Sequence, residues 1–348
     1  MKRYGNLYPK IFDFANIEKA FRLARKCKRY RDEVLRFTAN KEENLINIQN
    51  HLIWHSYRQG AYRVFKIHEP KERIISALPF VDRVVQHAIC NVIEPLLDKR
   101  FFYYSCACRK GRGMHFASAT ITRWIRNMSY DGRPLYALKG DIHHYFQSID
   151  HGVLKKILRR IFKDKELLWL LDLIIDSNGA ETGIPVGNLT SQLFANLYLN
   201  ELDRFVKETL HVKHYIRYMD DFIILSDDKR YLRDTLRRIE GFLLGTLHLS
   251  LNPKTAIINV KNGVDFCGYI HWRDYKKVRK SSVRRMRRTI RAYRRGKITK
   301  DHLQKSLQSW LGHIGHADTW HLQKKYWIQL NQFAYQIKKG NQNDDLWN

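Results

Sequence analysis

Acidic side chains are scarce in this sequence relative to basic ones. Its 348 residues carry 34 Asp and Glu against 63 Lys and Arg, a formal net charge of +29. A compact fold with such an excess repels itself, so a polyanionic partner is the natural explanation. A membrane surface would also attract this charge, but the basic residues are spread along the chain and no lipidation motif is visible. We therefore expect nucleic acid and no membrane as partner, since each neutralised phosphate releases counterions.

Long hydrophobic runs are missing as well. The longest apolar stretch, residues 167–175, is interrupted by Asp172 and is far shorter than the roughly 20 residues of a membrane span. The first residues are polar and lead into no apolar signal core. The five cysteines are odd in number and scattered, and Cys106 and Cys108 are too close together for a zinc knuckle. We therefore expect reduced thiols and a cytoplasmic location.

Proline and glycine are also few, at 7 and 18 residues, which leaves no long flexible linker. A composition of 44% hydrophobic and 13% aromatic residues is typical of a folded chain with a substantial core. The pattern predicts a mainly helical region over residues 1–134, short strands and helices over 135–275, and a basic helical segment over 276–348. Within the first region, residues 62–68 and 73–78 alternate like the two strands of a hairpin.

Periodicity also predicts individual elements in the central part of the chain. The expected strands are residues 135–142, 214–218 and 222–226, with a strand pair within 265–271 that turns near Gly263. The expected helices are residues 152–160, 167–176, 189–210 and 231–247.

Residues 276–297 carry twelve Lys and Arg and no acid. Val283, Met286, Ile290 and Tyr293 recur at spacings of three and four, which predicts an amphipathic helix with a cationic outer face. An ordinary solvated helix is the alternative, but such faces usually mix both signs of charge. We expect this helix to contact phosphates. The candidate contacts are Arg284, Arg287, Arg288 and Arg291.

Two adjacent carboxylates, Asp220 and Asp221, lie between two apolar strand segments. Neighbouring carboxylates repel each other unless a cation compensates. Magnesium is a hard ion that takes oxygen ligands and shares them with substrate phosphates. A solvated turn is the alternative for this pair taken alone.

A third carboxylate, Asp141, ends an apolar strand, and Phe146 follows five residues later. A nucleotide polymerase needs a metal-binding carboxylate here and an aromatic ring beneath the sugar of the incoming nucleotide. A bulky ring would clash with a 2′-hydroxyl and so select deoxynucleotides. Taken alone, Phe146 fits a core position equally well. Between the carboxylates, residues 182–192 contain a turn rich in glycine and proline that leads into the expected helix, where Thr190 or Ser191 could serve as a simple N-cap.

In order and spacing, Asp141 with Phe146, residues 183–192 and residues 218–221 resemble motifs A, B and C of reverse transcriptases. The resemblance extends over most of the chain, from about Arg73 onward. It implies an α+β right-hand polymerase fold with helical fingers (1–134), an antiparallel-sheet palm (135–275) and a small helical thumb. It also implies an RNA-directed DNA polymerase, a nucleotidyltransferase that uses two Mg²⁺ ions per active site, with Mn²⁺ as a substitute.

The resemblance assigns roles to single residues. Asp141 and Asp220 would bind the metal ions directly, and Asp221 would complete the cluster. The backbone carbonyl of Ile142 would be a further ligand. Lys254 matches the lysine of motif D and would protonate pyrophosphate, although most lysines are surface residues.

Further candidates contact the substrates. Lys66 and Arg73, on the expected finger strands, would grip the triphosphate, although ordinary edge-strand charges explain them as well. The other expected nucleotide contacts are Phe146, Val186, Gly187 and Gln192. The expected template contacts, set among glycines, are Arg109, Lys110 and Arg112.

Within the superfamily, residues 82–89, 105–115 and 187–192 most resemble the reverse transcriptases of diversity-generating retroelements. Val186 stands where many relatives have a glutamine that braces the nucleotide, and Gln192 where many have proline. The resemblance implies error-prone copying of a template RNA, opposite its adenines, into primer-linked cDNA from deoxynucleoside triphosphates. It also implies a small, basic, oligomeric accessory protein as partner.

Two kinds of protein are alternatives. The first is another bacterial reverse transcriptase of the phage-defence, retron or intron type. The sequence ends soon after its basic segment, with no appended nuclease or maturase module, which we take as evidence against the intron type. The second is an inactive RNA-binding relative, against which the retained aspartates speak. The paired histidines are expected to pack and not to bind zinc: His143, His144, His211, His214, His313 and His316.

Overall fold

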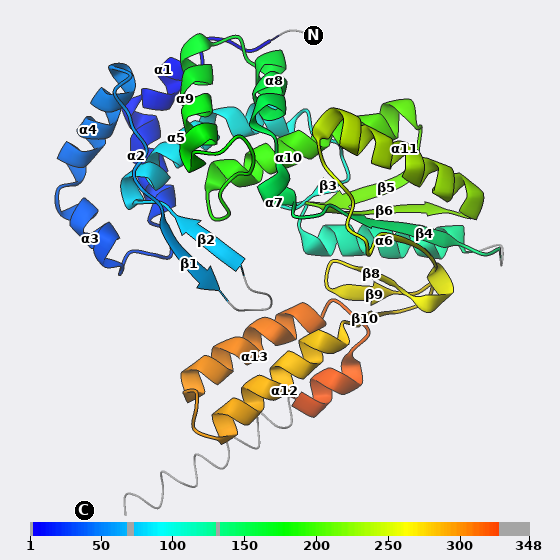
Figure 1. Cartoon of the computed structure of the whole chain (residues 1–348). Coiled ribbons are helices and arrows are strands. Elements are labelled where there is room, and N and C mark those ends of the chain that lie inside the picture. Colours follow the sequence, from blue (N-terminus) through cyan, green and yellow to red (C-terminus); the bar gives the residue numbers. More distant parts are fainter. Residues whose placement is uncertain (1–2, 68–72, 130–132, 327–348) are drawn as a thin grey trace, which may run out of the picture. The chain divides into compact units, whose positions relative to one another are not determined.

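The computed structural model describes residues 3–67, 73–129 and 133–326 (Figure 1). The helices are α1 (Tyr8–Phe12), α2 (Phe14–Ala24), α3 (Asp32–Ala39), α4 (Lys41–Ile53), α5 (Phe80–Asp98), α6 (Met114–Met128), α7 (Tyr145–Ser148), α8 (His151–Ile161), α9 (Lys165–Ile175), α10 (Leu189–Arg204), α11 (Lys229–Leu247), α12 (Lys280–Arg294) and α13 (Lys300–Ile314). The strands are β1 (Arg63–Ile67), β2 (Arg73–Ala77), β3 (Ser105–Cys106), β4 (Tyr136–Asp141), β5 (His214–Tyr218), β6 (Asp221–Ser226), β7 (Ala256–Asn259), β8 (Val264–Phe266), β9 (Tyr269–His271) and β10 (Lys276–Val278).

The strands form three sheets. A five-stranded sheet has the order β3-β5-β6-β4-β7, with β3 parallel to β5. A three-stranded antiparallel sheet has the order β10-β9-β8, and β1 pairs with β2 as an antiparallel hairpin. The order of the large sheet places β6 directly beside β4. The two strands that carry the predicted catalytic aspartates are therefore neighbours.

The chain divides into two compact units. The first unit comprises Met1–Gly113, Leu138–Ile224 and Arg230–Ala256, and the second comprises Met114–Ala137, Leu225–Lys229 and Ile257–Asn348. In the first unit α5 packs against both α2 and α10. Most side chains of α10 are buried, because this helix is covered by apolar neighbours instead of presenting one face to water.

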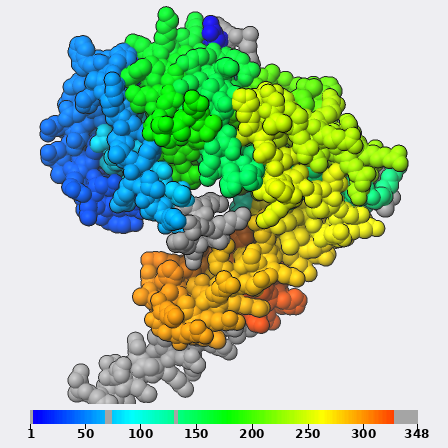
Figure 2. Space-filling view, in the orientation of Figure 1, coloured from blue at the N-terminus to red at the C-terminus, as the bar shows by residue number. Residues whose placement is uncertain are grey.

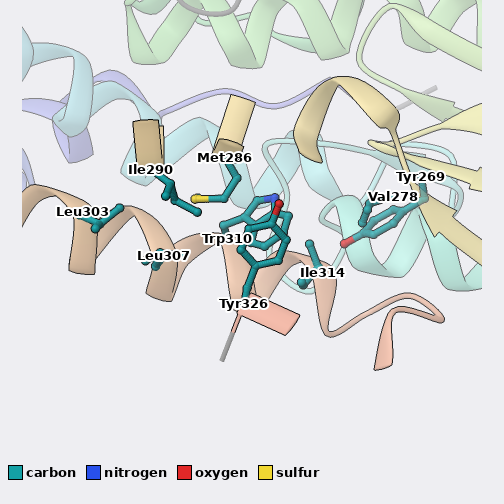
Figure 3. Close-up of a cluster of buried hydrophobic side chains, with 9 residues drawn as sticks. All are labelled: Tyr269, Val278, Met286, Ile290, Leu303, Leu307, Trp310, Ile314 and Tyr326. Carbon is teal, nitrogen blue, oxygen red and sulfur yellow. The ribbon is translucent and has the colours of Figure 1, made fainter. Parts of the chain in front are cut away.

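The second unit has a core of its own, drawn in Figure 3. Helices α12 and α13 pack together, and Met286 and Ile290 of α12 belong to one buried cluster with Leu303, Leu307, Trp310 and Ile314 of α13. The predicted apolar face of the basic helix is confirmed by this burial. The rest of α12 is rich in arginine and lies on the molecular surface, in the yellow-orange part of Figure 2.

Several predicted elements are confirmed, among them the hairpin that forms β5 and β6. Three predictions were wrong in detail. Residues 276–278 form strand β10 and not the start of a helix, because they pair with β9. The turn between β8 and β9 lies at Cys267 and Gly268, which have φ angles of 49° and 84°, and not near Gly263. The helix predicted to residue 210 is α-helical only to Arg204, and a π-helical turn, Phe205–Thr209, follows it.

Two short 3₁₀ turns, Asp176–Asn178 and Val260–Asn262, complete the secondary structure. Among the residues that the structure describes, no helix combines the length and the apolar character needed to cross a bilayer.

Candidate active site

The β5–β6 hairpin carries two of the predicted catalytic aspartates. Met219 and Asp220 form the turn, and Asp221 is the first residue of β6. Met219 has a φ of 55°, which is unusual for a residue other than glycine and indicates that its surroundings hold it in place. Both aspartates are half-buried, so their carboxylates stand on rigid backbone at a position that solvent can still reach.

The third aspartate belongs to the same end of the sheet. A Cβ added to Gly140 would lie 2.1 Å from the ring of Phe222, so the backbone of β4 rests directly on that ring. Asp141 follows Gly140, and Asp221 precedes Phe222. The contact therefore brings the neighbourhoods of Asp141 and Asp221 together, across two strands that are about 80 residues apart in the sequence.

Tyr145 gives a second indication of this proximity. Burial raises the pKa of its phenol well above the ordinary value, and the negative charge of Asp220 contributes to the same shift. Tyr145 lies four residues after Asp141, in α7. The charge of Asp220 is thus felt at the helix that immediately follows the strand of Asp141.

The carbonyl of Ile142 is not used in the backbone bridge between Ile142 and Leu251. The amide of Asn252 donates to the carbonyl of Asp141 at 2.7 Å, and the amide of His143 donates to the carbonyl of Ser250 at 2.9 Å. Ile142 and Leu251 are therefore the non-hydrogen-bonded pair of this antiparallel bridge. Because carbonyls alternate along an extended chain, that of Ile142 points away from Leu251, to the side on which β6 lies.

The donor set fits a divalent cation in its chemistry. Carboxylates and a backbone carbonyl are the oxygen ligands that Mg²⁺ prefers. Among the described residues, however, no three His, Cys, Asp or Glu side chains are already gathered into a metal-binding group. Carboxylates repel one another without a cation between them, and Mg²⁺ commonly completes its coordination with substrate phosphates and water. The assignment of the three aspartates as ligands stays a prediction.

Lys254 lies beside this end of the sheet in sequence and in structure. It is exposed and stands in a turn closed by the bond from the Thr255 amide to the carbonyl of Asn252, at 2.8 Å. Asn252 is the residue whose amide binds the carbonyl of Asp141. The turn thus connects Lys254 to the end of β4 at Asp141 through two backbone hydrogen bonds.

Phe146 is connected to the glycine-rich segment. Its carbonyl accepts a hydrogen bond from Ile184 at 2.8 Å, and Gly183 donates to Ile149 at 2.8 Å. Gly183 has a φ of 86°, and a Cβ there would lie 3.0 Å from the carbonyl oxygen of Gln147. Glycine is needed at this position for both reasons. The segment that carries Phe146 and the glycine-rich segment 182–192 are therefore joined by backbone hydrogen bonds.

The same segment also binds the β1–β2 hairpin. Ser76 of β2 donates its amide to the carbonyl of Val186 at 3.1 Å. Gly187 has a φ of 123°, and a Cβ there would lie 3.2 Å from the carbonyl oxygen of Ser76. Val186 is half-buried, whereas Gly187 and Gln192 are exposed.

The two residues expected to bind the triphosphate lie on β1 and β2. Lys66 is exposed on β1, opposite Ile74 of β2. Arg73 opens β2 in register with Ile67, and its side chain lies outside the described part of the structure.

The N-terminus of α10 is not capped by Thr190 or Ser191, the two residues considered as N-caps from the sequence. Thr190 and Ser191 are buried within the first turn and do not serve as N-cap. Instead, the amide of Leu189 donates to the side-chain oxygen of Gln86, on α5, at 3.1 Å. The cap comes from a distant helix, so local sequence could not reveal it.

The basic loop before α6 divides into two kinds of residue. The Arg109 side chain is only 5% exposed and binds Asp98 at 2.5 Å and the carbonyls of Phe102 and Ser105. Arg109 therefore holds the loop together, and its expected contact with the template stays a prediction. Arg112 packs over the ring of Tyr103 at 3.8 Å, and Lys110 is exposed.

The predicted phosphate contacts of α12 have the exposure that this role requires. Arg284, Arg288 and Arg291 lie away from the buried Met286 and Ile290, whereas Arg287 flanks that apolar face and donates to the hydroxyl of Tyr326 at 3.3 Å. Contact with phosphate itself stays a prediction for the exposed residues Arg284, Arg287, Arg288 and Arg291.

The histidines of the second unit stack on other rings. His313 lies over Tyr269 with 4.7 Å between ring centroids, and His316 lies over His115 with 3.7 Å. This packing agrees with the expectation that these histidines are structural.

Sequence reasoning missed Arg217, the residue of β5 that lies three positions before Asp220. The available signal was an arginine between apolar strand residues, since a charge in such a strand is rarely buried unless it is paired.

The chain combines helices with a five-stranded sheet, as a polymerase of the α+β right-hand class does. Residues 66–271, more than half of the chain, match the family described as "Reverse transcriptase (RNA-dependent DNA polymerase)". The chain belongs to the reverse transcriptase family.

Curated relatives share this region. The chain is 28% identical over 229 residues to protein YkfC of Escherichia coli K12. The alignment covers 54% of this chain and 60% of YkfC. It is 27% identical over 198 residues to the group II intron-encoded protein LtrA of Lactococcus lactis. This alignment covers 53% of this chain and 32% of LtrA. The chain thus spans less than two thirds of the length of either relative.

A solved structure of Candida albicans telomerase, in complex with a fragment of telomeric RNA, is also similar. It aligns with 13% identity and a TM-score of 0.49, and the alignment covers 64% of this chain and 46% of the telomerase chain.

Proposed function

We propose that this protein is an RNA-directed DNA polymerase that extends a primer along an RNA template. Family membership supports the reaction class. The contact between Gly140 and Phe222 is the observation that carries the proposal, because it brings the strand end of Asp141 to the hairpin of Asp220 and Asp221.

Asp141, Asp220 and Asp221 would hold two divalent ions, Mg²⁺ or Mn²⁺ as its substitute, with the carbonyl of Ile142 as a further ligand. Bound there, the ions would activate the primer 3′-hydroxyl and neutralise the leaving pyrophosphate. Lys254, on the turn beside Asp141, would donate the proton that pyrophosphate takes up.

The remaining site residues would orient the nucleotide and the nucleic acid. Phe146, fixed through its carbonyl to Ile184, would select against a 2′-hydroxyl. Lys66 and Arg73 would bind the triphosphate. The base and sugar would lie against Val186, Gly187 and Gln192. Phosphates of the template and primer would contact Lys110 and Arg112, together with Arg284, Arg287, Arg288 and Arg291.

Primer extension on an RNA template tests the proposal. We expect Mg²⁺-dependent extension by the wild type and background incorporation by Asp141→Ala, Asp220→Ala and Asp221→Ala. Asp227→Ala is the matched control, since Asp227 is exposed just beyond the same strand β6. Equal extension by the wild type and Asp220→Ala would remove the proposal and favour an inactive RNA-binding relative.

We further propose that the enzyme serves a diversity-generating retroelement, with a basic oligomeric accessory protein and a cytoplasmic location. Val186 and Gln192, which we propose lie against the incoming nucleotide, support this role by their departure from the residues that many relatives have there. Similarity to LtrA supports an intron-type role instead.

Sequencing cDNA copied from a defined RNA decides between the two. Errors concentrated opposite template adenines, reduced in Val186→Gln, support the retroelement role. Accurate copying at all four bases would contradict it.

A further inference from the structure

Arg217 is the largest fully buried side chain in the described part of the chain. It lies in β5, between Ile216 and Tyr218, and its guanidinium has no exposure to solvent. Moving a guanidinium out of water is costly unless its charge is paired and its donors are bonded. A buried arginine three residues from a catalytic position therefore needs a physical reason.

Its partners account for the charge. Arg217 and Asp203, at the end of α10, form a two-pronged ion pair with bonds of 2.7 Å and 2.5 Å, and neither side chain is exposed. The same guanidinium donates to the hydroxyl of Ser105, on β3, at 2.8 Å. Tyr215 donates its hydroxyl to Asp203 at 2.7 Å. The ion pair thus joins α10, β3 and β5 at one point.

One further bond reaches the catalytic turn. Arg217 donates through Nη1 to the carbonyl of Met219 at 2.8 Å. That carbonyl belongs to the peptide group that links Met219 to Asp220. The amide of Met219 donates to the carbonyl of Cys106 at 3.3 Å. Both peptide groups that flank Met219 are therefore held from outside the turn.

This double hold explains the conformation of Met219. A non-glycine residue with φ of 55° is strained by about 1–2 kcal/mol and persists only where its surroundings fix it. Here the fixing groups are the Arg217 guanidinium and the β3 backbone, and Asp220 is the next residue along the chain.

We propose that Arg217 is a positioning residue for Asp220, acting through the Met219–Asp220 peptide group. The inference rests on the proposed metal-dependent polymerase. Asp203 and Ser105 hold the guanidinium, and the guanidinium holds the peptide group. The direction of the Asp220 carboxylate follows from that peptide group. Lysine cannot replace arginine here, because an ammonium group lacks the planar fork that reaches Asp203 and Met219 together.

The test compares Arg217→Lys with Arg83→Lys in primer extension over a range of Mg²⁺ concentrations. Arg83 is a matched control in α5, 19% exposed and bonded to Glu33 and to the carbonyl of Leu78. We expect Arg217→Lys to raise the half-saturating Mg²⁺ concentration about tenfold to a hundredfold, as for other residues that orient a metal ligand. Extension should recover at high Mg²⁺. An unchanged Mg²⁺ requirement, or an equal shift in Arg83→Lys, would overturn the proposal.

Ser105→Ala is the second variant, for the case that Arg217→Lys does not fold. This variant removes one hydrogen-bond acceptor of Arg217 and leaves the charges in place. We therefore expect a smaller rise in the half-saturating Mg²⁺ concentration. An unchanged Mg²⁺ requirement would count against the proposal.

Hydrogen exchange separates this inference from the proposed function. Amides within residues 214–224 should exchange faster in Arg217→Lys than in the wild type, with no such change in Arg83→Lys. If the wild type and Asp220→Ala extend equally, the polymerase assignment fails, while the exchange result still decides the positioning role. Unchanged exchange would overturn it.

Discussion

Arginine serves opposite purposes in β5 and in α12. Arg217 of β5 is fully buried, and its guanidinium bonds Asp203, the hydroxyl of Ser105 and the carbonyl of Met219. The arginines of α12 are exposed on a helix whose opposite face is apolar. The first arrangement fixes one geometry. The second provides collective positive charge that suits a mobile polyanion. The difference predicts large, local effects of substitution in β5 and small, additive ones in α12.

Removing the partner of Arg217 should have the largest effect. Asp203→Asn leaves a buried guanidinium without its counter-charge, which costs about 3–5 kcal/mol of unfolding free energy. Chemical denaturation measures this loss. Asp265→Asn is the control, because the Asp265–Arg279 pair is 43% and 38% exposed and such pairs contribute about 0–1 kcal/mol. Similar losses in the two variants would contradict the distinction between buried and exposed arginines.

The second unit should lose stability in mild acid because of His271. Its ring is buried and contacts Thr122 at 3.0 Å, and burial lowers its pKa from 6.5 to about 4. Below pH 6.5 the His271 ring takes up a proton in the unfolded chain but stays neutral in the folded state, because its pKa is lower there. The free energy of unfolding therefore falls as the pH drops from about 6.5 to about 4, and then levels off. The full loss is about 3 kcal/mol.

Thermal unfolding of wild type and His271→Asn across that range measures the effect, and the variant should show a flatter pH dependence. His302→Asn, at an exposed position of α13, should retain the wild-type dependence. An unchanged slope in His271→Asn would refute this assignment.

Filling the contact between β4 and β6 should have an intermediate effect. Gly140→Ala places a methyl group against the ring of Phe222, and overpacking of this kind costs about 1–3 kcal/mol. Primer extension should fall as well, because the end of β4 carries Asp141. Adding Phe222→Leu should restore part of the lost unfolding free energy and part of the lost primer extension.

Gly241→Ala is the control for this substitution. Nothing lies within 4 Å of its Cβ in α11, so the change should stabilise by about 1 kcal/mol. A destabilisation of Gly140→Ala that Phe222→Leu does not relieve would show that the ring is not the cause.

Local sequence patterns predicted the elements of the site better than its long-range contacts. Apolar segments on both sides of Asp220 and Asp221 sufficed to predict the hairpin, because alternation and turn chemistry are local properties. The contact of Gly140 with Phe222 and the cap from Gln86 join segments that are distant along the chain.

Burial makes two arginines hard to interpret from the sequence. It decides what a charged side chain does, and a single sequence does not reveal that the side chains of Arg109 and Arg217 are buried. The boundaries of the fingers, palm and thumb stay a prediction.

The smallest effects belong to single arginines of α12. Arg288→Ala should leave the unfolding free energy nearly unchanged and weaken binding of a primer–template duplex independently of its sequence. The slope of log affinity against log salt concentration should fall by about one unit, since one phosphate contact and its released counterion are lost. Arg238→Ala is the control, as an exposed arginine on α11, where Asp234 and Glu240 lie nearby in the sequence. An equal change in salt slope for both variants would show that α12 contributes only net charge and no specific binding face.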